Sequence, residues 1–107
     1  KYLVPQGYPS NPLKNAQIRV NTSNLENHLR IYYGAVDRQH DGRLLMTGSR
    51  ALAVVGIGET LLDAEWETRC AISTRVLGPV QCRHDIGTEP LIQRRIDHVK
   101  ALKRIGA

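Results

Sequence analysis

The sequence predicts an α+β domain, with a small, mostly antiparallel β-sheet and two helices. Three observations lead to this fold class. Short β-favouring runs separated by Pro, Gly and Asn fill the first half of the chain, an almost continuous apolar run crosses its middle, and two segments with helical spacing follow. The chain has 107 residues, the usual size of one domain, so we expect residues 1–107 to form a single compact unit.

The strands are expected mainly in the first half of the chain. Five segments share β-favouring or alternating side chains: residues 2–4, 17–20, 29–36, 44–47 and 51–57. Asp41-Gly42 is a hairpin-turn signal that should pair the third and fourth of them. The fifth is nearly all apolar, which predicts a central strand covered on both faces. A further short strand is expected over residues 80–83.

The two helices are expected in the second half. Thr60 can cap the first, because Asp63 follows three residues later, and Gly78-Pro79 should end it. Thr88 should cap the second. Helical spacing places one set of side chains on one face of the first helix, namely Leu61, Ala64, Thr68, Ala71 and Ile72. It does the same for the second helix with Ile92, Ile96, Val99 and Leu102. Since Phe is absent, the aromatic part of the core should come from Trp66 and the four tyrosines.

The formal net charge of +5 favours anionic partners, and much of the excess lies in residues 89–107. Aromatic side chains do not accompany this basic segment, so we expect a solvated helix face and no nucleic-acid binding. No apolar run approaches the ~20 residues of a membrane span, so no membrane association is expected. Cys70 and Cys82 show no disulfide pattern, which favours a reduced, cytoplasmic protein. The chain lacks an initiator Met and is expected to belong to a longer polypeptide.

Three short motifs are candidates for a chemical role. The segment 56–60 joins a strand to a helix as phosphate-binding loops do, but it lacks the third glycine of a dinucleotide motif, which favours a tight turn. Cys82 and His84 lie two residues apart, but a structural zinc site needs four ligands and no second pair follows. Residues 47–50 place a hydroxyl and an arginine before the apolar strand. From the residues alone, Arg50 can equally bind a phosphate or pair with a surface carboxylate.

Three blocks of sequence then occur in order, covering residues 7–12, 46–64 and 83–88. The first reads Gly-Tyr-Pro with Asn-Pro shortly after it, and the third reads Arg-His-Asp-Ile-Gly-Thr. Together they resemble the C-terminal domain of the phosphoribosylamine–glycine ligase family, which belongs to the ATP-grasp superfamily. The resemblance covers nearly the whole chain. It is closer to archaeal than to bacterial members, which usually have Gly-Gly-Arg where this chain has Gly48-Ser49-Arg50.

The resemblance implies a complete enzyme that ligates glycine to 5-phosphoribosylamine through a glycyl phosphate and makes glycinamide ribonucleotide for purine biosynthesis. ATP and Mg²⁺ or Mn²⁺ would serve that enzyme, and the residues that bind them in the family lie upstream of this region. No catalytic residue, no metal site and no activity of the chain alone are therefore expected. The implied partners are the upstream ATP-grasp domain, glycine and 5-phosphoribosylamine.

By similarity to related ATP-grasp enzymes, Arg50 is expected to bind the phosphate of 5-phosphoribosylamine, with Gly48 and Ser49 donating beside it. Arg83 and Asp85 are a second candidate pair, in which Asp85 is expected to have mainly a structural role. Two alternatives stay open. The chain could be the corresponding domain of another ATP-grasp enzyme, such as a ribonucleotide carboxylase or biotin carboxylase, or a basic binding module without enzymatic activity.

Overall fold

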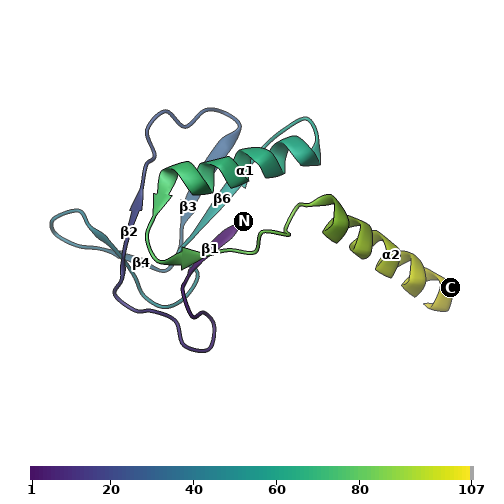
Figure 1. The fold of residues 1–107 in the computed structure, drawn as a ribbon, viewed down its shortest axis with the longest axis horizontal. Helices are drawn as coiled ribbons and strands as arrows, with labels where there is room; N and C mark the ends of the chain where they lie inside the picture. Colours follow the sequence, from purple (N-terminus) through teal and green to yellow (C-terminus); the bar gives the residue numbers. More distant parts are fainter. Residues whose placement is uncertain (107) are drawn as a thin grey trace.

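A computed structural model describes residues 1–106 and shows ten elements of secondary structure in them (Figure 1). The strands are β1 (Tyr2–Pro5), β2 (Gln17–Val20), β3 (Leu29–Tyr33), β4 (Val36–Arg38), β5 (Leu44–Met46), β6 (Leu52–Gly56), β7 (Val76–Leu77) and β8 (Val80–Gln81). The helices are α1 (Leu61–Arg75) and α2 (Glu89–Gly106). The predicted α+β fold class is confirmed.

The strands form two antiparallel sheets rather than one. Their orders are β3-β6-β1-β8 and β4-β5-β2-β7. The predicted strand over residues 29–36 is divided between them, because the chain leaves the first sheet at Gly34-Ala35 and enters the second as β4. The amides of Gly34 and Ala35 donate to the carbonyl oxygens of Ala51 and Arg50, both at 2.8 Å. The predicted hairpin is confirmed for β4 and β5, with Val36 opposite Met46.

Strand β6 is central in its sheet, as predicted, but only one of its faces is covered. Helix α1 packs on the face that carries Leu52 and Val54, which are 1% and 0% exposed. Gly56 lies on this face as well, and a Cβ there would clash with the carbonyl oxygen of Ala64. The opposite face carries Val55, which remains exposed. The prediction of a strand covered on both faces is therefore wrong, because among residues 1–106 a helix packs on one side of this sheet alone.

The core is aliphatic, and the expectation of an aromatic contribution is wrong. Its fully buried residues come from both sheets: Leu3, Ile18, Met46, Leu52 and Val54. Trp66 points outward from α1, where the guanidinium of Arg69 covers its ring at 4.9 Å from the centroid. Tyr2 and Tyr32 both stand opposite Ala53 in the β-ladders and extend from the uncovered face of the sheet. The aromatic residues therefore form surface rather than core.

Helix α1 begins as predicted, since the Thr60 hydroxyl accepts a hydrogen bond of 3.1 Å from the Asp63 amide. It ends at Arg75, before Gly78-Pro79, because Val76 and Leu77 are extended and pair with β2. Of the side chains predicted to share one face of this helix, Thr68 and Ala71 are buried, whereas Leu61 in the first turn is half exposed.

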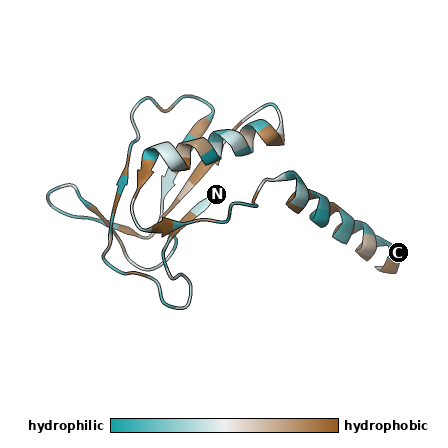
Figure 2. Ribbon diagram, viewed as in Figure 1, coloured by the Kyte–Doolittle hydropathy of each residue, from teal (hydrophilic) through white to brown (hydrophobic). Residues whose placement is uncertain are grey.

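Helix α2 projects away from the two sheets (Figure 1). The radius of gyration is 16.5 Å, against roughly 13 Å for a compact domain of this length. Figure 2 shows apolar residues along this helix, and Ile96, Val99 and Leu102 of the predicted stripe are 42%, 48% and 54% exposed. The chain is therefore more extended than the compact arrangement expected from the sequence, and the predicted stripe is largely exposed. Within residues 1–106, neither helix has the length and apolar character that crossing a membrane requires.

Candidate functional site

A pocket of about 850 Å³ opens at the end of the first sheet, where β1 and β8 lie side by side. It brings together residues from three distant parts of the sequence: Lys1, Tyr2, Val4, Tyr8, Arg50, Gln81, Cys82, Arg83 and Ile86. Two of the predicted site residues, Arg50 and Arg83, thus line the same pocket although 33 positions separate them. Cationic groups and tyrosine rings on a partly apolar wall suit an anionic ligand with an organic part.

Arg50 has a fixed backbone and an exposed side chain. Its carbonyl oxygen accepts from the amide of Ala35, and the amide of the next residue, Ala51, donates to the carbonyl oxygen of Leu3 at 2.9 Å. The guanidinium lies over the ring of Tyr2, 5.2 Å from its centroid, which is cation–π distance. The ion pairs found within residues 1–106 do not include Arg50. Of the two interpretations that the residues left open, pairing of Arg50 with a surface carboxylate is not found within residues 1–106.

Gly48 and Ser49 precede Arg50 but do not line the pocket. Gly48 has φ +113°, a backbone conformation that favours glycine, and a Cβ there would touch the side chain of Lys14 at 3.3 Å. Ser49 is exposed. Lys14 is a cation beside this loop that the sequence analysis missed, because the loop carrying it gives no spacing signal toward residue 48.

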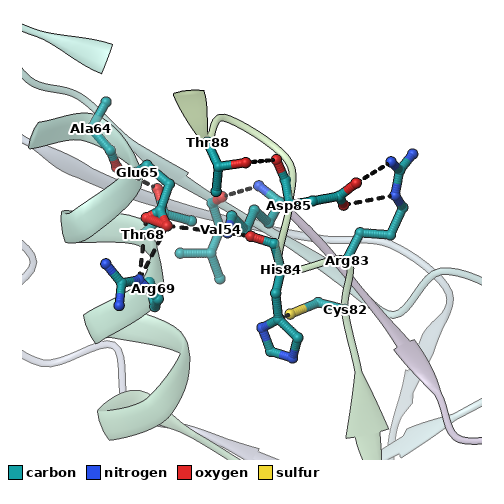
Figure 3. Close-up of polar contacts among 11 residues, drawn as sticks. Val54, Ala64, Glu65, Thr68, Arg69, Cys82, Arg83, His84, Asp85 and Thr88 are labelled. Carbon is teal, nitrogen blue, oxygen red and sulfur yellow. Dashed lines mark hydrogen bonds and ion pairs between the residues drawn. The ribbon is translucent and has the colours of Figure 1, made fainter. Parts of the chain in front are cut away.

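Arg83 and Asp85 pair with each other (Figure 3). The Arg83 Nε and Nη2 donate to the two carboxylate oxygens of Asp85 at 3.1 and 2.8 Å. The hydrogen bond from Arg83 lowers the pKa of Asp85 from its ordinary value, with the charges of Arg83 and Arg94 acting in the same direction. The same carboxyl raises the pKa of Arg83. Two donors of Arg83 are engaged in this way, whereas no side-chain hydrogen bond of Arg50 is found within residues 1–106.

The surroundings of Asp85 anchor the start of α2. Arg94, in the second turn of the helix, lies 3.9 Å from the Asp85 carboxylate. The Thr88 amide and hydroxyl both donate to the Asp85 carbonyl oxygen, at 3.1 and 2.6 Å (Figure 3). The helix therefore begins directly after Thr88, as predicted, but the Thr88 hydroxyl donates back to the Asp85 carbonyl oxygen, which is not the bond of a side-chain cap that accepts from a helix amide.

A buried ion pair that shares Lys1 with the pocket lining was not predicted. The Nζ of Lys1 lies 3.8 Å from the Glu65 carboxylate and donates to the His84 carbonyl oxygen at 3.0 Å. The side chains of Lys1 and Glu65 are only 4% and 7% exposed. Arg69 adds hydrogen bonds of 3.1 and 3.2 Å to the same carboxylate (Figure 3). One sequence signal was available: Glu65 falls on the inner face of α1 by helical spacing, and a carboxylate on such a face needs a buried partner.

Two further motifs have structural explanations. Gly56 and Gly58 leave no room for a Cβ against the first turns of α1, so close packing of strand and helix requires them, rather than a tight turn. The Cys82 sulfur lies 4.0 Å from Nδ1 of His84, although β8 has already ended at Gln81. Within residues 1–106, no group of three or more His, Cys, Asp or Glu side chains could hold a metal ion.

Comparison with known proteins bears on the whole chain. Residues 1–89 match the family model described as phosphoribosylglycinamide synthetase, C domain. A phosphoribosylamine–glycine ligase from Methanocella arvoryzae is 43% identical over 103 residues, which are 96% of this chain and 23% of that relative. Relatives of the same name from Methanococcus vannielii and Pyrococcus furiosus are 43% and 41% identical, over 95% and 96% of this chain and 23% of each relative. The chain thus spans about a quarter of the length of the curated relatives it matches.

Proposed function

The chain belongs to the phosphoribosylglycinamide synthetase C-domain family, and we propose that it is the C-terminal part of a longer ATP-dependent ligase that joins glycine to 5-phosphoribosylamine. The product would be glycinamide ribonucleotide, an intermediate of purine biosynthesis. The observation that carries this proposal is the agreement of the family match over residues 1–89 with relatives of one name at about 43% identity. Free Cys70 and Cys82 agree with a cytoplasmic location.

The proposed reaction needs activation of a carboxylate. An amine does not displace oxygen from a carboxylate, so the glycine carboxyl must first gain a phosphoryl group, which makes its oxygen a leaving group. ATP with Mg²⁺ or Mn²⁺ would supply that phosphoryl group. The described residues do not fit such a metal site, since no carboxylate cluster is available and Asp85 is paired with Arg83. We therefore assign ATP and metal binding to the remainder of the longer protein.

The role proposed for this chain is to hold the phosphate of 5-phosphoribosylamine at the pocket. Arg50 supports it best, because its guanidinium is exposed, rests on Tyr2 and has no carboxylate partner within residues 1–106. A planar fork can donate two parallel hydrogen bonds to one phosphate and so fixes its orientation as well as its position. Arg83 is proposed as a supporting charge at the same pocket. Gly48 and Ser49 lie outside its lining, and we propose them as donors from the loop that leads into Arg50.

The proposal is tested by measuring glycinamide ribonucleotide formation in four samples: the complete ligase, its upstream part alone, this chain alone, and the two parts mixed. We expect activity in the complete ligase, none in this chain alone, and far more in the mixture than in the upstream part. An upstream part that is fully active and gains nothing from this chain would refute a role for the pocket. A complete ligase that makes no product would refute the activity itself.

A further inference from the structure

The exposed stripe of α2 has no role in the proposed function. Ile92, Ile96 and Val99 follow one another at spacings of four and three, so they lie on one side of the helix, and Leu102 continues the line. Ile96, Val99 and Leu102 are each between 42% and 54% exposed. Apolar side chains repeated on one side of an exposed helix mark a surface that is covered by a partner.

The contacts that hold α2 lie at its root, the N-terminal turns, and not along its apolar stripe. Leu91, in the first turn, is only 8% exposed, whereas the apolar side chains of the stripe from Ile96 onward are exposed. Asp85 ties the root to the preceding segment through its carbonyl bonds with Thr88 and through its carboxylate pair with Arg94. The helix is therefore held out from the sheets by its own anchoring contacts, and the stripe beyond Leu91 stays available to another surface.

A second copy of this chain is a poor match for the stripe. A partner surface for the basic, apolar helix α2 should be acidic and apolar, and on a second copy such a surface lies on the outer face of α1, around Leu62 and Trp66. The guanidinium of Arg69 already covers the Trp66 ring, and the Glu67 carboxylate lies 3.1 Å from Nε2 of His28. A basic helix that docked there would bring its own cations against Arg69, which is unfavourable.

The length of the relatives points to a different occupant. In Methanocella arvoryzae the aligned region takes in 103 residues of this 107-residue chain, so it reaches well into α2, yet it is 23% of that ligase. The helix therefore belongs to the part that the relatives share, and most of each relative lies outside that part. In such a protein, α2 can bind a surface of the same polypeptide, and this binding does not carry the entropic cost of bringing two molecules together.

Resting on the proposed function, we propose that α2 is a docking arm whose stripe packs into an apolar groove on the upstream part of the same ligase. Arg95 and Lys103 fall on the same half of the helix as the stripe by its spacing, and their stems can cover apolar surface while their charges reach outward. The groove should therefore carry carboxylates along its rim. Docking of this arm would hold the pocket of Arg50 against the upstream part.

Hydrogen–deuterium exchange of α2 amides tests the proposal in the complete ligase and in the 107-residue chain alone. We expect the amides from about residue 93 to 104 to exchange at least about 30-fold more slowly in the complete ligase. Equal rates in the two samples would overturn the proposal. Slow exchange in the isolated chain together with a doubled mass in sedimentation would assign the stripe to a second copy instead, and would overturn it too.

Two variants of the complete ligase identify the surface that docks. Ile96→Gln combined with Val99→Gln keeps helix propensity and net charge but removes the apolar stripe, and should abolish the protection of α2. Ala101→Gln places the same side chain outside the stripe and should leave the protection unchanged. Equal effects of the two variants would refute the role of the stripe. An unmodified ligase with a protected α2 but no glycinamide ribonucleotide synthesis would refute the proposed activity and leave the docking intact.

Discussion

Replacing Arg50 by alanine should weaken the use of 5-phosphoribosylamine while leaving the handling of ATP and glycine nearly intact. The guanidinium is exposed in the pocket and contacts Tyr2, so its removal should leave the packing of the domain unchanged. Charge-assisted hydrogen bonds from one guanidinium fork to a phosphate contribute about 2–3 kcal/mol net. The loss corresponds to a decrease of about 30- to 150-fold in kcat/KM for that substrate. Arg50→Lys keeps the charge without the fork and should lose about tenfold.

The assay is initial-rate formation of glycinamide ribonucleotide by the complete ligase, with each of the three substrates varied in turn. Arg38→Ala is the matched control, since Arg38 is an exposed arginine on β4 in the other sheet and its loss changes the net charge equally. It should leave all three values of kcat/KM within about twofold. The reasoning is refuted if Arg50→Ala matches the Arg38→Ala control, or if it raises the KM for ATP as much as that for 5-phosphoribosylamine.

Three further perturbations test how the pocket and the fold are held. Tyr2→Leu removes the ring that the Arg50 guanidinium covers and should lower kcat/KM for 5-phosphoribosylamine by about two- to fivefold. Tyr2→Phe keeps the ring and should keep the wild-type value. Identical kcat/KM values for the two variants would exclude a role of the ring in positioning Arg50. Glu65→Gln strips a buried lysine of its 3.8 Å partner and should lower the free energy of unfolding by about 3–5 kcal/mol in urea titrations. The more exposed Glu67→Gln should cost under about 1 kcal/mol, and equal costs would contradict a buried charge cluster. The pKa of Asp85 is lowered in the folded state, so its pairing stabilises the fold above the ordinary pKa of 3.8, and this stabilisation is lost as the pH falls through the lower folded pKa. Asp85→Asn should therefore make the free energy of unfolding less dependent on pH below about pH 4. Parallel pH profiles of the two proteins would contradict a stabilising role of the Asp85 pairing.

Much of the local structure could be predicted from short-range signals. The Thr60 hydroxyl caps α1 through the Asp63 amide, and the turn at Asp41-Gly42 joins β4 to β5. Such signals act between residues a few positions apart, so their geometry follows from the backbone and side chains of a single segment. The family blocks likewise depend only on residue order.

The functional surfaces could be predicted in part. The sequence singled out Arg50 and Arg83 separately, yet their place in one pocket depends on β1 lying between β6 and β8. The structural role expected for Asp85 agrees with its contacts to Arg83 and Thr88. The buried carboxylate of Glu65 was missed, because its partner Lys1 lies far away in the sequence, at the start of the chain, and no local pattern links the two.

The sequence by itself determined the fold class, the positions of most strands, the starts of both helices and the family. The tertiary structure alone decided that residues 29–36 divide between two sheets, that the aromatic side chains stay outside, and that α2 projects with its stripe exposed. Local patterns record which side chains prefer burial, but not which surfaces are present to cover them. In the described part of this chain, one sheet face and one helix lack a covering layer, and only the spatial arrangement of distant segments shows this.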